Sequence, residues 1–363
     1  MSCEPAGRRA GLMVCGAILA VFVVQRPQCG EHRYDHPQLA LEALQVGRYD
    51  QALLEVRRSL REGADTPGVR LIAAMAHLAE DRVEEAVTEL GAGLAVAPDD
   101  SRLHQTLREV SLQARRVGLA DTVLQGALRR HPESTALLTA LGWAATEQGQ
   151  DQRAAELLAR AVERSAGDPA PRVELARLHL SQERFGAAVE VAQEGLRATP
   201  DDPHLLLVLG EGQLRLGRLA EADTALAQAV HLGDSEEVLA GRVAQLYYDA
   251  GHRRQAIRYY EAALAAGPQR PSVLNNLAWS MAEEGVRLDE ALELASRAVK
   301  LDPDNPVFLD TYAEVNFRLG RPARAAAVIR RALDAEPVDG EHRLYLEQQL
   351  ARFTGIAAAA GDR

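Results

Sequence analysis

The chain has 363 residues, of which only 4% are aromatic, and its formal net charge is −11. A body this acidic repels a phosphate backbone, so we expect no nucleic-acid partner. All three cysteines lie in the first 30 residues, which leaves the rest of the chain without a disulfide framework or a thiolate metal site.

The first element in the chain is an uncharged apolar run, residues 10–24, preceded by Arg8 and Arg9. As a helix it would span about 22 Å, short of the roughly 30 Å hydrocarbon core of a bilayer. This length and the flanking arginines are typical of a secretory signal or a short signal anchor. No small-x-small cleavage site follows, so retention as an anchor, inefficient cleavage, lipidation at Cys15 and a buried N-terminal helix, which would leave the chain in the cytoplasm, all stay open. We expect residues 1–33 to form a signal peptide or signal anchor that places the body in a bacterial envelope, facing the periplasm.

From about residue 34 to residue 337 the sequence repeats with a period of 34 residues. The first repeated column is Ala52, Ala86, Ala120, Ala154, Ala188, Ala222, Ala256, Ala291 and Ala325, with one gap of 35 residues before Ala291. Seven residues after each of these alanines stands a second small residue, and a third small column, from Ala40 to Ala313, is interrupted only by Arg108. Helices approach closely where side chains are small, so the columns predict pairs of packed helices.

Glycine and proline punctuate the repeat where helices must end. Between the two predicted helices of their units stand Gly47, Gly149, Gly217, Gly251, Gly285 and Gly320. A proline follows the second helix in most units, and pairs such as Asp202-Pro203 and Asn305-Pro306 begin the next one. The acidic pairs Asp99-Asp100 and Asp201-Asp202, and the pair Asp302/Asp304, lack the ligand number of a calcium loop, and we interpret them as capping turns.

The 34-residue period, the columns of small residues and the glycines and prolines at the helix ends together resemble the tetratricopeptide repeat, a helix–turn–helix unit of 34 residues. The resemblance covers residues 34–337 and implies an all-α, right-handed superhelical solenoid of about nine units. After it, residues 338–363 are predicted to form a capping helix, with Leu344, Tyr345 and Leu350 on its apolar face, and a frayed tail. The segment around residues 274–320 is similar to repeats of bacterial envelope proteins that help to assemble outer-membrane, pilus or exopolysaccharide machinery.

Motifs for catalysis are absent from the sequence. Lys300 is the only lysine and lies outside any P-loop, and no Gly-x-Ser-x-Gly or His-Glu-x-x-His occurs. The histidines occupy many different positions within the 34-residue unit, so they form no repeated site. We therefore expect no enzyme, no cofactor, no metal and no small-molecule substrate.

The resemblance implies that the first helix of each unit lines a concave groove for a partner segment. The residue after the third small column then lies near the groove, and both tryptophans of the chain occupy this position. Tryptophan, tyrosine and arginine are the residue types of interface hot spots, although packing between units explains the tryptophans equally well. The predicted groove residues are Trp143, Arg177, Gln245, Tyr248, Asn275, Trp279, Asp310, Glu314 and Phe317.

The sequence thus predicts a non-catalytic adaptor that binds a protein or peptide partner in its groove and contacts the membrane through its N-terminal segment. The alternative is a structural spacer of a membrane complex that binds nothing in the groove.

Overall fold

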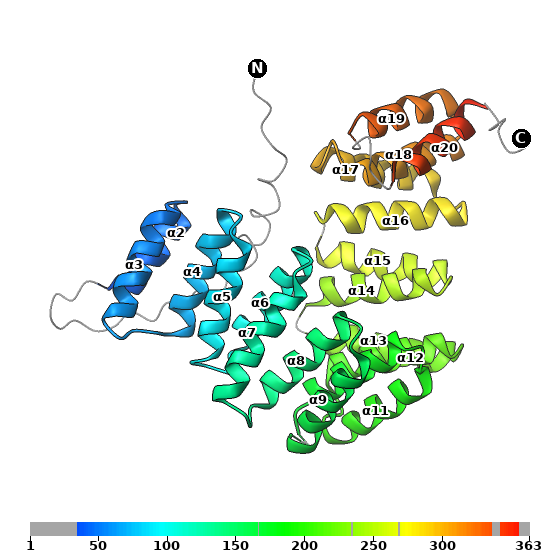
Figure 1. The fold of residues 1–363 in the computed structure, drawn as a ribbon. Coiled ribbons are helices and arrows are strands. Elements are labelled where there is room, and N and C mark those ends of the chain that lie inside the picture. Colours follow the sequence, from blue (N-terminus) through cyan, green and yellow to red (C-terminus); the bar gives the residue numbers. More distant parts are fainter. Residues whose placement is uncertain (1–34, 166, 234, 268, 336–341, 356–363) are drawn as a thin grey trace, which may run out of the picture. The chain divides into compact units, whose positions relative to one another are not determined.

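A computed structural model describes residues 35–165, 167–233, 235–267, 269–335 and 342–355. These residues contain helices α2 to α20 and no strand, so the predicted all-α architecture of consecutive helix pairs is confirmed (Figure 1). The predicted signal segment, residues 1–33, and the end of the tail lie outside the described residues. Within the described part, no helix combines the length and the hydropathy that a membrane crossing requires.

The chain divides into two compact units, residues 1–182 and 183–363, and each is described by itself. The helices of the first unit are α2 (His36–Gln45), α3 (Tyr49–Arg61), α4 (Pro67–Ala79), α5 (Val83–Leu94), α6 (Ser101–Gln113), α7 (Val117–Arg130), α8 (Thr135–Glu147), α9 (Asp151–Arg164) and α10 (Ala170–Ser181). Those of the second unit are α11 (Phe185–Ala198), α12 (Pro203–Arg215), α13 (Leu219–Leu232), α14 (Glu236–Asp249), α15 (Arg253–Ala266), α16 (Pro271–Glu284), α17 (Leu288–Leu301), α18 (Pro306–Arg318), α19 (Pro322–Ala335) and α20 (Arg343–Thr354). Within each unit, helices adjacent in the chain pack against each other.

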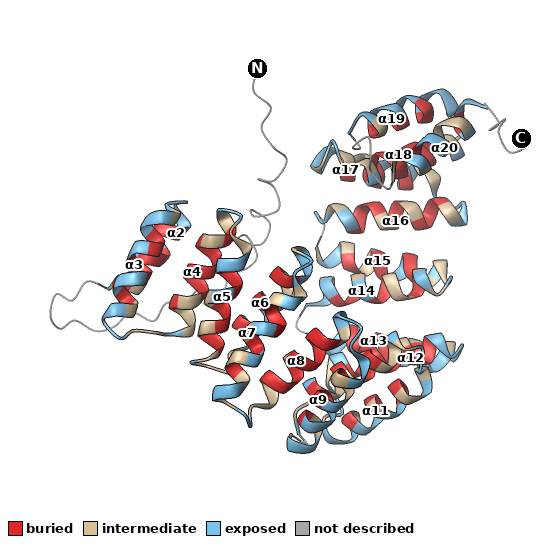
Figure 2. Cartoon of the chain, in the orientation of Figure 1, coloured by how far each residue is buried: buried red, intermediate tan, exposed pale blue. Residues whose placement is uncertain are grey.

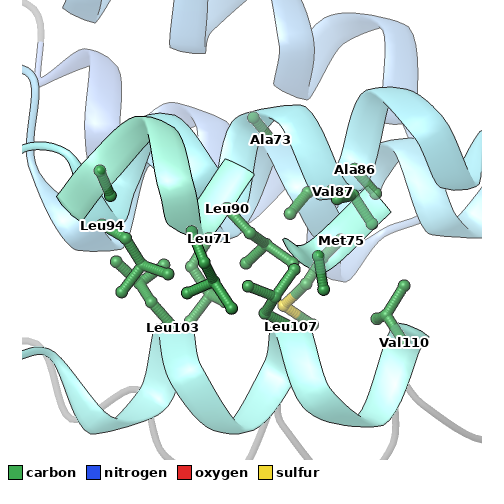
Figure 3. Packing of buried hydrophobic residues seen from close by; sticks show 14 of the residues in the cluster. Leu71, Ala73, Met75, Ala86, Val87, Leu90, Leu94, Leu103, Leu107 and Val110 are labelled. Carbon is green, nitrogen blue, oxygen red and sulfur yellow. The ribbon is translucent and has the colours of Figure 1, made fainter. Parts of the chain in front are cut away.

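The small residues of the repeat form the closest contacts between helices. All nine alanines of the first column are fully buried, and the buried positions recur on every helix pair in Figure 2. In the third column a Cβ on Gly210 would lie 2.5 Å from Leu226 Cγ, and one on Gly142 would lie 2.5 Å from Leu158 Cγ. The large residues fill the remaining space, as Leu71, Met75, Leu90, Leu103 and Leu107 do between α4, α5 and α6 (Figure 3).

The turn inside each helix pair passes through the left-handed backbone region. Six of these turns use glycine, as predicted, and the other three place Asp81, Arg115 and Glu183 at φ of 60°, 53° and 57°. Side chains with a Cβ are strained there. After the turns between units, the first helices α6, α12 and α18 begin with side-chain caps at Asp100, Asp202 and Asn305. Asp100 and Asp202 are therefore capping residues, as predicted. In the turn that contains Asp302 and Asp304, the residue that caps the next helix is Asn305.

The C-terminal helix α20 packs against α19 and the last repeat, and two of the three residues predicted on its apolar face, Tyr345 and Leu350, are partly buried there. Leu346 and Phe353 are its buried residues, while Leu344 is 66% exposed. The prediction that Leu344 belongs to the buried face is wrong. A single short helix with few apolar residues allows more than one orientation, and contacts with α18 decide which face is buried.

Candidate functional site

A pocket of about 270 Å³ opens in the second unit between the first helices of three successive repeats and the start of α20. Helix α14 contributes Gln245 and Tyr248, α16 contributes Asn275, Asn276 and Trp279, and α18 contributes Asp310 and Thr311. Tyr260 of α15, Val307 of α18, His342 and Tyr345 complete the lining. Five of the nine predicted groove residues, Gln245, Tyr248, Asn275, Trp279 and Asp310, are thus brought together in one pocket.

Tyr248 and Trp279 form an aromatic wall of the pocket, and hydrogen bonds between repeats hold it in place. Trp279 donates from Nε1 to the hydroxyl of Tyr248 at 2.7 Å. The guanidinium of Arg253 lies 4.0 Å from the centre of the Tyr248 ring, donates to the Tyr248 carbonyl, and pairs with Glu283 at 2.8 Å. These contacts fix the orientation of both rings, because each is bound at its polar edge or on one face.

Amides and hydroxyls form a second wall. The Tyr260 hydroxyl donates to Gln245 Oε1 at 2.7 Å, and Asn276 Nδ2 donates to the same oxygen at 3.4 Å. Asn275 Nδ2 in turn donates to Asn276 Oδ1 at 3.3 Å. Burial raises the pKa of Tyr260 to about 12, so its hydroxyl keeps its proton at neutral pH and remains a donor.

Asp310 is the one carboxylate among the residues that line the pocket. It is 6% exposed, and burial raises its pKa to about 6, although a hydrogen bond from Tyr345 and the charge of Arg352 act in the opposite direction. Near neutral pH the carboxyl group is therefore ionised but poorly solvated. Such a group interacts strongly with any cation or donor that enters the pocket.

The remaining predicted residues of the second unit contact α20 instead of the pocket. Glu314 is 3% exposed, accepts a hydrogen bond from Arg318 at 2.6 Å and pairs with Arg352 of α20. Phe317 lies 4.7 Å from Phe353, centre to centre. Helix α20 thus covers the part of the last repeat that was predicted to be open groove.

The two tryptophans, which share one position of the repeat, have different surroundings. Trp279 is half-buried in the pocket, whereas Trp143 of the first unit is only 3% exposed. The guanidinium of Arg108 lies 4.9 Å from the centre of the Trp143 ring and donates to Glu174 at 2.7 Å, which also accepts from Arg177 at 2.8 Å. Packing therefore accounts for Trp143, and the large residue that interrupts the third column covers its ring.

Six pocket residues were absent from the predicted groove: Tyr260, Asn276, Val307, Thr311, His342 and Tyr345. Asn276 follows a predicted residue directly, so it left a signal in the sequence. Tyr260 belongs to the second helix of its unit, outside the positions that were expected to line the groove. The residues at the start of α20 left no signal, because their position depends on how that helix docks. Among the described residues, no three histidine, cysteine or carboxylate side chains cluster as a metal site would require.

Comparison with known proteins identifies the repeat. One tetratricopeptide repeat model matches residues 43–110, 145–211 and 281–350, and a second matches residues 111–169 and 244–306. The chain belongs to the tetratricopeptide repeat family.

Several known proteins are similar to parts of the chain. A TPR repeat-containing protein of Pseudomonas aeruginosa is 38% identical over 74 residues, which are 20% of this chain and 12% of that protein. Cellulose synthase operon protein C of Pseudomonas fluorescens is 25% identical over 257 residues, 65% of this chain and 20% of that protein. The chain thus spans a small part of these relatives. A crystal structure of the APC/C hetero-tetramer Cut9–Hcn1 shares the fold, with 13% identity, a TM-score of 0.50, and coverage of 88% of this chain and 64% of that one.

Proposed function

We propose that the chain is a non-catalytic adaptor that binds an extended segment of a partner protein in the pocket of its second unit. The observation that carries the proposal is the set of amide, hydroxyl and aromatic side chains that α14, α16 and α18 direct into one space. Such groups pair with the peptide N–H and C=O of an extended segment, and the rings cover its side chains. Hydrogen bonds already hold Trp279, Tyr248, Gln245 and Asn276 in place, so little ordering is needed on this side of the interface.

The proposal places this adaptor in a bacterial envelope, facing the periplasm and either anchored in the inner membrane or secreted. Two observations support the location: the arginine-flanked apolar run of residues 10–24, and the similarity of 65% of the chain to cellulose synthase operon protein C. An exopolysaccharide assembly is therefore the first candidate complex, ahead of secretion or pilus machinery. Fusion of residues 1–40 to a phosphatase that is active only outside the cytoplasm tests the location. An inactive fusion that is stably produced would contradict it.

Co-purification from native membranes tests the binding function. Tagged full-length chain is compared with Trp279→Ala and Asn276→Ala, which remove one ring and one amide from the pocket. Tyr312→Ala is the matched control, because Tyr312 is an aromatic residue of α18 that contacts Arg324 and does not line the pocket. Circular dichroism shows whether each variant keeps its helices.

A partner that is present with wild type and the control, and depleted with both pocket variants, supports the adaptor. Equal recovery of the same partners with all four proteins contradicts the pocket as the binding site. Recovery of no partner with any of them favours the structural spacer over the adaptor.

A further inference from the structure

Two acceptor atoms in the pocket have no donor. Asn275 Oδ1 and Asp310 Oδ1 are buried and accept no hydrogen bond from any described residue. Asn275 is 4% exposed and Asp310 is 6% exposed, and both side chains line the pocket. Buried polar atoms are almost always paired, and leaving one unpaired destabilises the protein. Two such acceptors in one pocket indicate a ligand that donates hydrogen bonds.

The charge of the pocket also favours a donor that is positive. Asp310 contributes a carboxylate, and neither lysine nor arginine is among the described residues that line the space. The nearby Arg352 pairs with Glu314, on the adjacent turn of α18. The whole chain carries a formal charge of −11, which attracts a basic partner over longer distances.

Aromatic rings surround these acceptors. Tyr248, Tyr260, Trp279 and Tyr345 all line the pocket. The faces of such rings attract ammonium and guanidinium groups, and the attraction is strongest where water is excluded. Arg253 of the same unit shows this contact already: it does not line the pocket, and its guanidinium lies 4.0 Å from the centre of the Tyr248 ring.

We propose that this pocket takes one basic side chain, arginine or lysine, of an extended partner segment. The cationic group donates to Asp310 and Asn275, and its aliphatic stem lies along the aromatic wall. An acidic side chain is rejected because it would bring a second carboxylate against Asp310 and leave both acceptors unpaired. This inference rests on the proposed function, since it names the chemistry by which the pocket selects its partner.

Peptide binding to the purified full-length chain at pH 8 tests the inference. The probes are four pools of blocked heptapeptides with degenerate flanks and a central arginine, lysine, citrulline or glutamine. Citrulline has nearly the shape of arginine and no charge, so the ratio of the two affinities isolates the charge. The variants are Asp310→Asn and, as a matched control, Asp334→Asn, which removes one exposed carboxylate of α19 outside the pocket.

The arginine or lysine pool is expected to bind at least about tenfold more tightly than its neutral counterpart. Asp310→Asn is expected to remove most of this preference, whereas Asp334→Asn leaves it unchanged. Equal binding of charged and neutral pools to wild type overturns the inference and leaves the proposed function in place. Binding of no pool at all, with co-purification that is indifferent to Trp279→Ala, overturns both. The wild-type comparison decides the matter even if Asp310→Asn fails to fold.

Discussion

The indole of Trp279 donates a hydrogen bond to the hydroxyl of Tyr248 at 2.7 Å, and the two residues belong to the first helices of successive repeats. This bond closes one side of the pocket and joins α14 to α16 through side chains. It also distinguishes Trp279 from Trp143, whose Nε1 is buried without a hydrogen-bond partner among the described residues.

Tyr248→Phe should therefore loosen the pocket without unfolding the unit. The variant loses the hydrogen bonds to Trp279 and Glu283, each of which stabilises by about 1 kcal/mol, and keeps the ring that Arg253 covers. Hydrogen exchange in α14 and α16 should speed up several-fold, and exchange in α4 and α5 should not change. Unchanged exchange in α16 would show that these bonds contribute nothing.

Asp310→Asn should stabilise the second unit at pH 8. Because burial raises the pKa of Asp310 to about 6, from 3.8, the folded chain holds this proton more tightly than the unfolded chain does. Stability is then lost as pH rises from about 4 to about 6, and the loss amounts to at most about 3 kcal/mol above that range. Thermal melting at pH 8 and pH 5 checks this. The variant's advantage should shrink at pH 5, and an equal advantage at both values would contradict the assignment.

Binding of the arginine pool should weaken as pH falls below about 6. Protonation of Asp310 removes the charge that attracts the ligand, and affinity then drops by up to about tenfold for each pH unit. The charged and titratable groups near Asp310 are His342, Tyr345, Arg352 and Glu314. Among these, His342→Gln should preserve the pH profile, whereas Asp310→Asn should flatten it. If the pH dependence of binding is lost in His342→Gln and kept in Asp310→Asn, Asp310 is not its cause.

Arg115→Gly should stabilise the first unit. Arg115 is exposed and sits at φ 53°, in the turn between α6 and α7, where six other units use glycine. Relief of this strain is expected to contribute about 0.5–1 kcal/mol. The reciprocal change, Gly149→Ala at φ 68°, should cost about 1 kcal/mol. Urea unfolding followed by circular dichroism measures both, and shifts of the same sign in the two variants would refute the argument.

Gly210→Ala should destabilise the second unit by about 1–3 kcal/mol, because the added methyl group meets Leu226 in a closely packed core. The control is Gly186→Ala in α11, where no neighbouring atom lies within 4 Å of the new methyl group. Since alanine favours helix over glycine, this control should be neutral or stabilising. Equal melting temperatures for the two variants would show that the contact with Leu226 relaxes freely.

The sequence alone determined the helix pairs, their turns and their small-residue contacts. A column such as Ala52 to Ala325 has a local cause that recurs in every unit: only a small side chain allows the two helices to approach. The need for glycine at positive φ also has a local cause, namely the turn between the two helices of a unit. The repeat therefore predicts the position of this turn even in the units that use Asp81 or Arg115 there. The same periodicity placed Gln245, Tyr248, Asn275, Trp279 and Asp310 on neighbouring helix faces.

Only the tertiary structure decided which of these side chains share a pocket. Trp143 and Trp279 occupy one position of the repeat, yet Arg108 covers the first, and Tyr248 binds the second at the edge of the pocket. Helix α20 has no counterpart in the repeat, so its docking against Glu314 and Phe317, and the place of Tyr345 beside Asp310, follow from no periodic pattern. Burial and charge at one site depend on contacts between elements far apart in sequence, and a repeat specifies only the contacts that every unit shares.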